Sequence, residues 1–135
     1  MPNTPSDLRY TREHEWARLE DDGRITIGIT DYAQDQLGDI VYLQLPAQGA
    51  DVSSGEPMGE VESTKSVSDI YSPVSGKVAE VNSEVVETPE AVNQDPYGEG
   101  WLIGIDPSDP TEFDALMTAE EYEQFLTEEA GEEVG

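Results

Sequence analysis

The chain is a series of short stretches in which apolar and polar residues alternate, separated by segments that contain glycine and proline. A period of two puts every second side chain on one face, as in a half-buried β-strand. In the two clearest stretches, the side chains predicted to point inward are Ile25, Ile27 and Ile29 of residues 24–29, and Val41, Leu43 and Leu45 of residues 40–45. The pattern therefore favours a mainly β protein with many short strands.

Residues 58–61 and 67–71 are two further apolar stretches, and the polar segment between them has Lys65 at its centre. A single strand over residues 58–71 would exceed the usual length of about three to ten residues. We therefore predict a β-hairpin with Lys65 exposed at its turn.

Capping signals predict short helices between the strands. Asp31 precedes Gln34 by the spacing of a capping box, and Gly38 is a typical helix end. Thr88 followed by Pro89 predicts a second helix start.

Strand alternation returns at residues 78–81 and 101–105, after which the apolar period becomes helical. Capping boxes at residues 109–112 and 118–121 predict a C-terminal pair of helices packed on the strands.

The length and a hydrophobic content of 36% suit one core, so residues 1–135 are expected to form a single domain. Its core is expected over about residues 8–127, followed by an acidic tail at 128–135. The longest apolar run, residues 40–43, is too short to span a bilayer, and the first ten residues lack the pattern of a signal peptide. We therefore expect an intracellular protein.

Six basic residues face 31 acidic ones, which gives a net charge of −25. Nucleic acids and anionic membranes are bound through Lys and Arg, so this composition argues against both kinds of partner. One interpretation is a halophile-type surface whose carboxylates are screened at high salt. The alternative is an acidic protein that binds basic partners.

Few residues are candidates for chemistry. His14, between Glu13 and Glu15, is the only histidine, and it is best interpreted as a polar strand residue near Trp16 because no nucleophile or second ligand accompanies it. The absence of cysteine excludes thiol chemistry and Cys-based zinc sites. At the predicted turn, Lys65 suits covalent attachment of a cofactor arm, but its spacing alone favours an ordinary surface lysine.

The segment VESTKSVSDIYSPVSGKVAEVN around Lys65 resembles the lipoyl-attachment region of the glycine cleavage system H protein family. The resemblance extends over nearly the whole chain: HEWARLEDDGRITIGITDYAQDQLGDIVYLQLPAQG is similar to the family's N-terminal half, and NQDPYGEGWLIGI to its last strand. It implies a barrel-sandwich hybrid, in which two small sheets wrap together and present the lysine at a β-turn.

Carried over residue by residue, the resemblance makes Lys65 the attachment point of lipoic acid, as N6-lipoyl-lysine. Glu62, Ser63 and Ser66 would form the context recognised by a lipoate ligase or lipoyl transferase. Gly76 would be the turn residue of the SPVSG element that biotinyl and lipoyl domains share.

The resemblance also implies a non-catalytic shuttle. It would accept an aminomethyl group from a pyridoxal-phosphate glycine decarboxylase, present it to a tetrahydrofolate-dependent aminomethyltransferase, and be reoxidised by dihydrolipoamide dehydrogenase. Since the chain has no cysteine, dithiol–disulfide chemistry must reside in the attached cofactor. No metal is expected, and the location is expected to be a prokaryotic cytoplasm at high salt.

A carried aminomethyl group needs protection from water, so we expect a cleft beside the arm, lined by His14, Glu15 and the helix over residues 31–36. Glu15 is expected to be a partly solvated carboxylate that pairs weakly with the loaded amine.

The sequence leaves three alternatives. A biotin carrier shares the fold type, but its lysine typically has methionine neighbours, whereas here they are Thr64 and Ser66. A lipoyl domain of another multienzyme complex would usually be fused to an acyltransferase, and an unmodified acidic interaction protein would need no cofactor.

Overall fold

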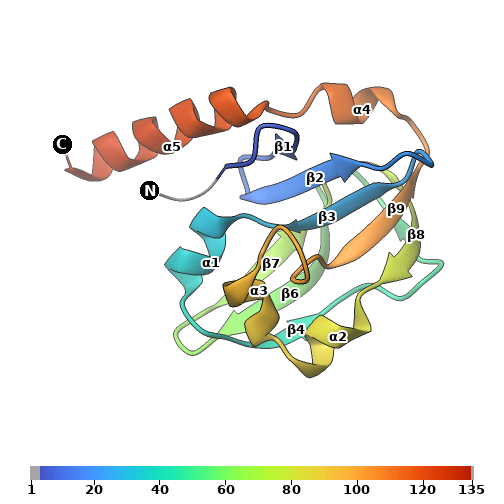
Figure 1. The fold of residues 1–135 in the computed structure, drawn as a ribbon, viewed down its shortest axis with the longest axis horizontal. Helices are drawn as coiled ribbons and strands as arrows, with labels where there is room; N and C mark the ends of the chain where they lie inside the picture. Colours follow the sequence, from blue (N-terminus) through green and yellow to red (C-terminus); the bar gives the residue numbers. More distant parts are fainter. Residues whose placement is uncertain (1–3, 135) are drawn as a thin grey trace.

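The computed structural model describes residues 4–134, which form two β-sheets with helices around them (Figure 1). The larger sheet runs in the order β1 Arg9–Tyr10, β2 Glu15–Leu19, β3 Ile25–Ile29, β9 Ile103–Pro107, β8 Gly76–Val81 and β5 Asp51–Val52. The smaller sheet runs in the order β4 Ile40–Gln44, β6 Pro57–Ser63 and β7 Val67–Tyr71. The helices are α1 Asp31–Leu37, α2 Ser83–Glu87, α3 Glu90–Gln94, α4 Thr111–Asp114 and α5 Ala119–Val134. The predicted mainly β fold of two sheets is confirmed.

The strand pattern of residues 24–29 is confirmed by β3, which lies between β2 and β9 in the larger sheet. In antiparallel register, Ile25 pairs with Ile105 and Ile27 with Ile103, and all four side chains are fully buried. The same core cluster contains the inward residues of the smaller sheet. The two sheets therefore share one apolar interior, as in a sandwich.

β4 departs from its predicted pattern at its first residues. Its pairing with β6 shifts register between Ile40 and Tyr42, which marks a β-bulge. Ile40 and Leu43 are buried, whereas Val41 is half exposed. The prediction that Val41 points inward is wrong, because an extra residue in one strand interrupts the alternation of faces. Leu45 packs partly buried against the core, as predicted.

α1 begins where predicted but has a different cap. The hydroxyl of Thr30 accepts a hydrogen bond from Ala33 N at 3.1 Å. Asp31, the predicted cap, is the first helical residue and accepts a bond from the Gln34 side chain at 2.7 Å. The predicted end at Gly38 is confirmed, and its φ of 81° lies in the left-handed region that favours glycine.

Two short helices, α2 and α3, connect β8 to β9, although the sequence predicted only the second. Asn82 caps α2 by accepting a hydrogen bond from Glu84 N at 3.2 Å. Thr88 ends α2 and gives α3 no side-chain cap, so its predicted capping role is wrong. The helix start predicted at Pro89 is correct to within one residue, because Pro89 takes the cap position and Glu90 is the first helical residue.

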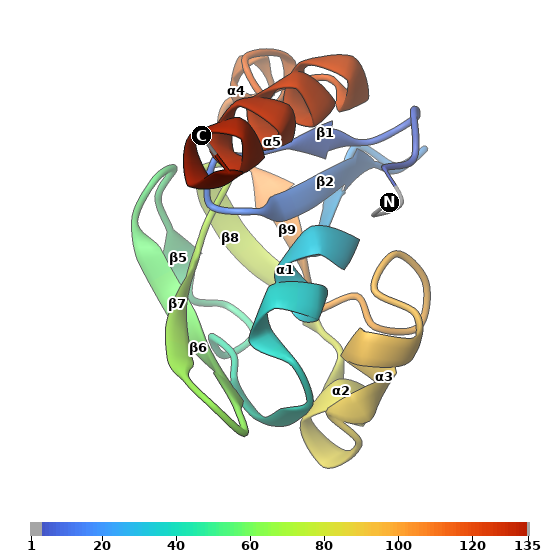
Figure 2. The ribbon, with the colours of Figure 1, turned by 90° about the vertical axis from the view of Figure 1, so that its left-hand side faces the viewer.

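The C-terminal helices lie over β1 and β2, at one side of the larger sheet (Figure 2). The capping box predicted at residues 118–121 is confirmed. Thr118 N donates to the Glu121 carboxylate at 2.9 Å, and Glu121 N donates to the Thr118 hydroxyl at 3.2 Å. These reciprocal bonds fix the start of α5.

The other predicted box, at residues 109–112, is incomplete. The Glu112 carboxylate accepts a hydrogen bond from Ser75 N at 2.7 Å, so this side chain ties α4 to the turn before β8. The predicted tail at 128–135 continues α5 as far as Val134, and Gly135 lies outside the described residues.

Candidate functional site

Lys65 lies in the turn between β6 and β7, and its side chain is exposed. Ser63 organises this turn. Its backbone N donates to Ser66 O at 2.8 Å, and its hydroxyl oxygen accepts from Ser66 N at 3.1 Å and from Lys65 N at 3.3 Å. Ser63 itself is buried, so the backbone of the turn is fixed from inside while the lysine side chain extends into solvent.

The turn is also held by the loop that follows α1. Thr64 N donates to Asp39 O at 3.1 Å. A β-carbon placed on Gly38 would lie 3.6 Å from Lys65 Cε, so the stem of the lysine passes close to this loop. The tip of the hairpin and the loop after α1 are therefore in contact and hold each other in place.

Asn93 of α3 fixes the same loop from its other side. Its side-chain amide donates to Gly38 O at 2.8 Å and to Gln34 Oε1 at 3.0 Å, and its Oδ1 accepts from Ile40 N at 2.9 Å. Sequence reasoning missed Asn93 and Asp39, because they act on or through backbone atoms that are remote in sequence.

The three residues of the predicted recognition context come together around Lys65 but on different faces. Glu62 is exposed on the outer face of β6, in register with Tyr42 of β4 and Val67 of β7. Ser63 points inward, and Ser66 is exposed in the turn.

A cleft of about 170 Å³ lies between α1, the hairpin strands and the segment that leads into β2. It is lined by Glu13, His14, Glu15, Ile29, Tyr32, Ala33, Gln36, Leu37, Val61, Ser68, Asp69 and Ile70. The structure thus brings together His14, Glu15 and α1, which the sequence analysis placed in such a cleft. Tyr32 and Asp69 were missed, because neither stands in a distinctive motif.

Glu15 is buried, with 2% of its surface exposed. One carboxylate oxygen accepts from the Thr11 hydroxyl at 2.7 Å, and the other accepts from Tyr71 N at 3.1 Å. Burial raises the pKa of Glu15 to about 7, against the opposing effect of these hydrogen bonds. The expectation of a partly solvated carboxylate is therefore wrong, because β2 carries this side chain inward.

His14 precedes β2 and has a φ of 71°, so it is not the strand residue that the sequence suggested. Its Nδ1 lies 2.8 Å from the Tyr122 hydroxyl, which also lies 2.8 Å from the hydroxyl of Thr30. Its ring lies 4.8 Å from the ring of Tyr32. Burial lowers the pKa of His14, so this residue joins α5 to the start of α1 as a neutral group.

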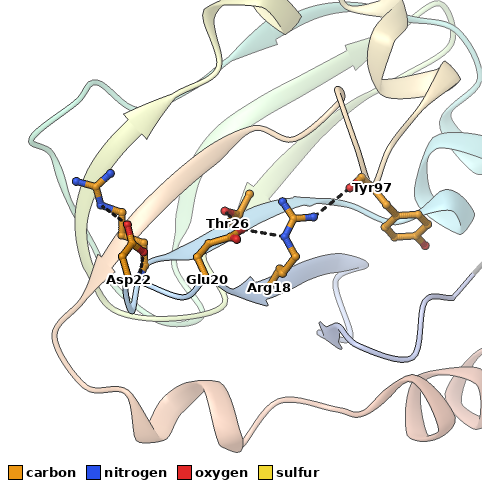
Figure 3. Close-up of polar contacts among 6 residues, drawn as sticks. Arg18, Glu20, Asp22, Thr26 and Tyr97 are labelled. Atoms are coloured by element: carbon orange, nitrogen blue, oxygen red, sulfur yellow. Dashed lines mark hydrogen bonds and ion pairs between the residues drawn. The ribbon is translucent and has the colours of Figure 1, made fainter.

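A second concave surface, of about 290 Å³, lies on the outer face of the larger sheet, and Figure 3 shows the polar contacts of Arg18, Glu20 and Thr26 in it. Glu20 accepts from the Thr26 hydroxyl at 2.6 Å and from Arg18 Nε at 2.8 Å, and these bonds lower its pKa. Arg18 also donates to the backbone oxygen of Tyr97 at 3.3 Å. The guanidinium of Arg18 is thus already bound to Glu20 and Tyr97, so we assign no anion site to this surface.

Among the side chains that the structure describes, those of residues 4–128, no group of three or more His, Cys, Asp or Glu residues is arranged to hold a metal ion. No helix in this part of the chain is long and apolar enough to cross a membrane.

Two sheets that share one core, with a lysine exposed at a fixed hairpin turn, are the arrangement of a carrier domain of the biotinyl and lipoyl type. A family profile described as glycine cleavage H-protein matches residues 8–129. The chain therefore belongs to the glycine cleavage H-protein family. This membership does not favour the three alternatives, namely a biotin carrier, a lipoyl domain of another complex and an unmodified acidic protein.

Individual relatives agree with this assignment. The chain is 56% identical over 125 residues to a glycine cleavage system H protein of Anaeromyxobacter sp. (strain K), with 93% of this chain and 97% of the relative covered. It is 53% identical over 126 residues to one of Geobacillus sp. (strain WCH70), covering 93% and 98%. A crystal structure of a glycine cleavage system H protein from Mycobacterium marinum superposes with a TM-score of 0.85 at 44% identity, covering 91% of this chain and 98% of that one.

Proposed function

We propose that this chain is the lipoyl-bearing shuttle of the glycine cleavage system, with Lys65 as the residue that carries lipoic acid. The observation that supports this role is the exposed Lys65 at a turn fixed from two sides, in a chain of the H-protein family. Among the described residues, Lys65 has no ion-pair partner, whereas the Lys77 amine lies 3.0 Å from the Asp51 carboxylate.

When bound, the lipoyl group supplies a dithiol–disulfide pair to a chain that has no cysteine. Attachment joins Lys65 Nζ to the lipoate carboxyl as an amide. A ligase first activates the carboxyl with ATP, which releases pyrophosphate, and the amine then displaces AMP and loses a proton. The bonds of Ser63 and Asp39 to the turn restrict the backbone, so motion is confined to the side chain. A short tether of this kind raises the local concentration of the carried group at each partner.

The cleft is the proposed resting place of the carried aminomethyl group. Its apolar walls, which include Ile29 and Ile70, would exclude water. Of the carboxylates that line it, Glu13 and Glu15 are suited to a cationic amine, whereas Asp69 pairs with Glu60 on the outward face of the hairpin. Because Glu15 is buried, its charged form would bind that amine more strongly than an exposed surface pair does.

The partners follow from this role. We propose that the chain meets a pyridoxal-phosphate glycine decarboxylase, a tetrahydrofolate-dependent aminomethyltransferase and dihydrolipoamide dehydrogenase in turn. A lipoate ligase or lipoyl transferase would act before them, with Glu62, Ser63 and Ser66 as part of its recognition context. The chain itself would be a non-catalytic component.

Intact mass and peptide mapping test the attachment site after incubation of the purified protein with a lipoate ligase, lipoate and ATP. We expect one lipoyl group, on Lys65. Lys65→Arg keeps the positive charge but removes the acceptor amine, so it should fold normally and stay unmodified. Lys77→Arg is the matched control and should be modified like the wild type. Lipoate on Lys77, or on neither lysine, would refute the proposal.

A further inference from the structure

Large apolar side chains are exposed at few places in the described residues, and three of them gather beside the Lys65 turn. The exposed ones are Leu19, Val41, Tyr42, Val67 and Val86, and the three near the turn are between 50% and 58% exposed. We call Val41, Tyr42 and Val67 the tip patch. Neighbouring exposed apolar groups of this kind are typical of interaction sites, whereas single ones are ordinary.

The register of the smaller sheet places this patch. Tyr42 pairs with Glu62, and Glu62 pairs with Val67, so Tyr42, Glu62 and Val67 form one row across the strands, and Val41 precedes Tyr42 at the bulge of β4. Residues directly opposite one another point to the same face of a sheet. That face is the outer one, because Leu43 and Val61, the next residues along, are buried. The row is the last one before the turn that holds Lys65.

The outer face is uncovered and acidic at its margins. Figure 2 shows α1, α2 and α3 on the opposite side of the β6–β7 hairpin. The neighbouring row contains Gln44, Glu60 and Asp69, all exposed. An apolar centre with a charged rim is the usual composition of a transient protein interface. A partner surface complementary to it would therefore have an apolar centre and a basic rim.

The short reach of an unmodified lysine side chain indicates which partner enzyme must contact this surface. Its amine stands at the end of a four-carbon stem, so an enzyme that acylates it must bring its active site against the turn itself. Enzymes that act on the lipoyl end can stand further away, because the acyl chain extends the arm. The enzyme that must touch the hairpin face is therefore the one that attaches the cofactor.

We propose that the tip patch, with Glu60 and Glu62 at its rim, is the docking surface for the enzyme that acylates Lys65, and that this enzyme meets it with apolar and basic side chains. This inference rests on the proposed function, since it assumes acylation of Lys65. The patch binds the enzyme and orients the turn, and it takes no part in the chemical step.

The experiment uses the unmodified full chain and a purified ATP-dependent lipoate ligase. The test variant is Tyr42→Thr with Val67→Thr, which keeps β propensity while removing apolar surface. The control is Leu19→Thr with Val86→Thr, which removes similarly exposed apolar groups away from the hairpin. Acylation is followed by intact mass, and affinity is measured separately on the Lys65→Arg background, where no product forms.

We expect kcat/KM of the test variant to fall about ten-fold, through KM, with a similar loss of affinity. The control should stay within about two-fold of the wild type. Added NaCl should weaken binding of the wild type, and Glu60→Gln should reduce that salt dependence. Equal unfolding midpoints in urea would show that the variants remain folded.

The inference is overturned if the test variant is acylated and bound like the wild type. It is also overturned if acylation is normal but glycine decarboxylation is lost, because the patch would then serve a turnover partner. Self-association that the test variant abolishes, with normal acylation, would assign the patch to a second copy of the chain. Failure of the wild type to be acylated at Lys65 would refute the proposed function itself, and this inference with it.

Discussion

Glu15 lines the cleft but is buried, and two hydrogen-bond donors contact its carboxyl group. Burial raises its pKa from 4.5 to about 7. Between those two pH values the folded protein keeps a proton that the unfolded chain has released. The free energy of unfolding therefore falls as the pH rises through this window, and stays level above it.

We expect Glu15→Gln to abolish this dependence, because an amide does not titrate. The stability of the variant relative to the wild type should rise by about 3 kcal/mol between about pH 4.5 and about pH 8. Urea denaturation of both proteins across that range measures the difference. Parallel stability curves for the two proteins would contradict a raised pKa at Glu15.

Asn93 allows a second prediction at this scale. Asn93→Ala leaves Gly38 O and Ile40 N without the side chain that now binds them, at a cost of about 1–2 kcal/mol. The effect should extend to the lysine turn, so the Thr64 amide should exchange hydrogen faster. Gln94→Ala, at the exposed next position of α3, is the control and should leave Thr64 unchanged. Unaltered exchange at Thr64 in Asn93→Ala would show that the loop does not support the turn.

The candidate site was predictable only where a residue carries a local signal. Lys65 stands at the polar centre of a hairpin pattern, and His14 and Glu15 lie in the matched N-terminal segment. Asn93 and Asp39 could not be predicted. Asn93 binds backbone groups that are far away in sequence, and Asp39 contributes only its backbone carbonyl oxygen.

At the scale of elements, strict alternation identified β3, since a buried face imposes the period on the sequence. The β6–β7 hairpin was predicted instead from two apolar stretches around a polar centre. The bulge in β4 was not predicted, because nothing in the local sequence tells a bulged residue from an alternating one. α2 was missed because its five residues are too few to show a helical stripe.

α5 is an element whose stability depends on residues far away in sequence. Tyr122 is buried and stacks on Tyr10 with ring centroids 4.7 Å apart. The guanidinium of Arg12 lies 5.1 Å from the centre of the Phe125 ring. The acidic helix has no basic residue in its last turn, so the compensating charge comes from the N-terminal segment.

We expect α5 to loosen before the sheets when salt is removed, because unscreened carboxylates repel one another along the helix. Hydrogen exchange at low and high salt would show the order. Amides of residues 120–127 should lose protection at low salt, while those of β3 serve as the internal control. Equal protection of the helix and the strand at low salt would contradict this account.

At the scale of the molecule, a net charge of −25 on 135 residues opposes compaction. Cations offset little of it: the ion pairs Arg18–Glu20, Arg24–Glu80 and Lys77–Asp51 all lie at the surface, where such pairs contribute about 1 kcal/mol or less. Packing of the two sheets must therefore hold the fold against repulsion, and the strength of that repulsion depends on the solvent.

The whole protein should become more stable as NaCl rises from about 0.1 M to about 1 M, because the screening length falls from about 10 Å to about 3 Å over that range. The urea midpoint at each salt concentration measures this change in stability.

Salt can also stabilise proteins by strengthening apolar burial, which does not depend on carboxylate charge. Repeating the series near pH 4 separates the two effects, because about half of the 31 acidic groups are then protonated. If screening dominates, the salt dependence should shrink markedly at the lower pH. An equal dependence at both pH values would mean that salt acts on apolar burial, and that repulsion among the carboxylates does not limit this fold.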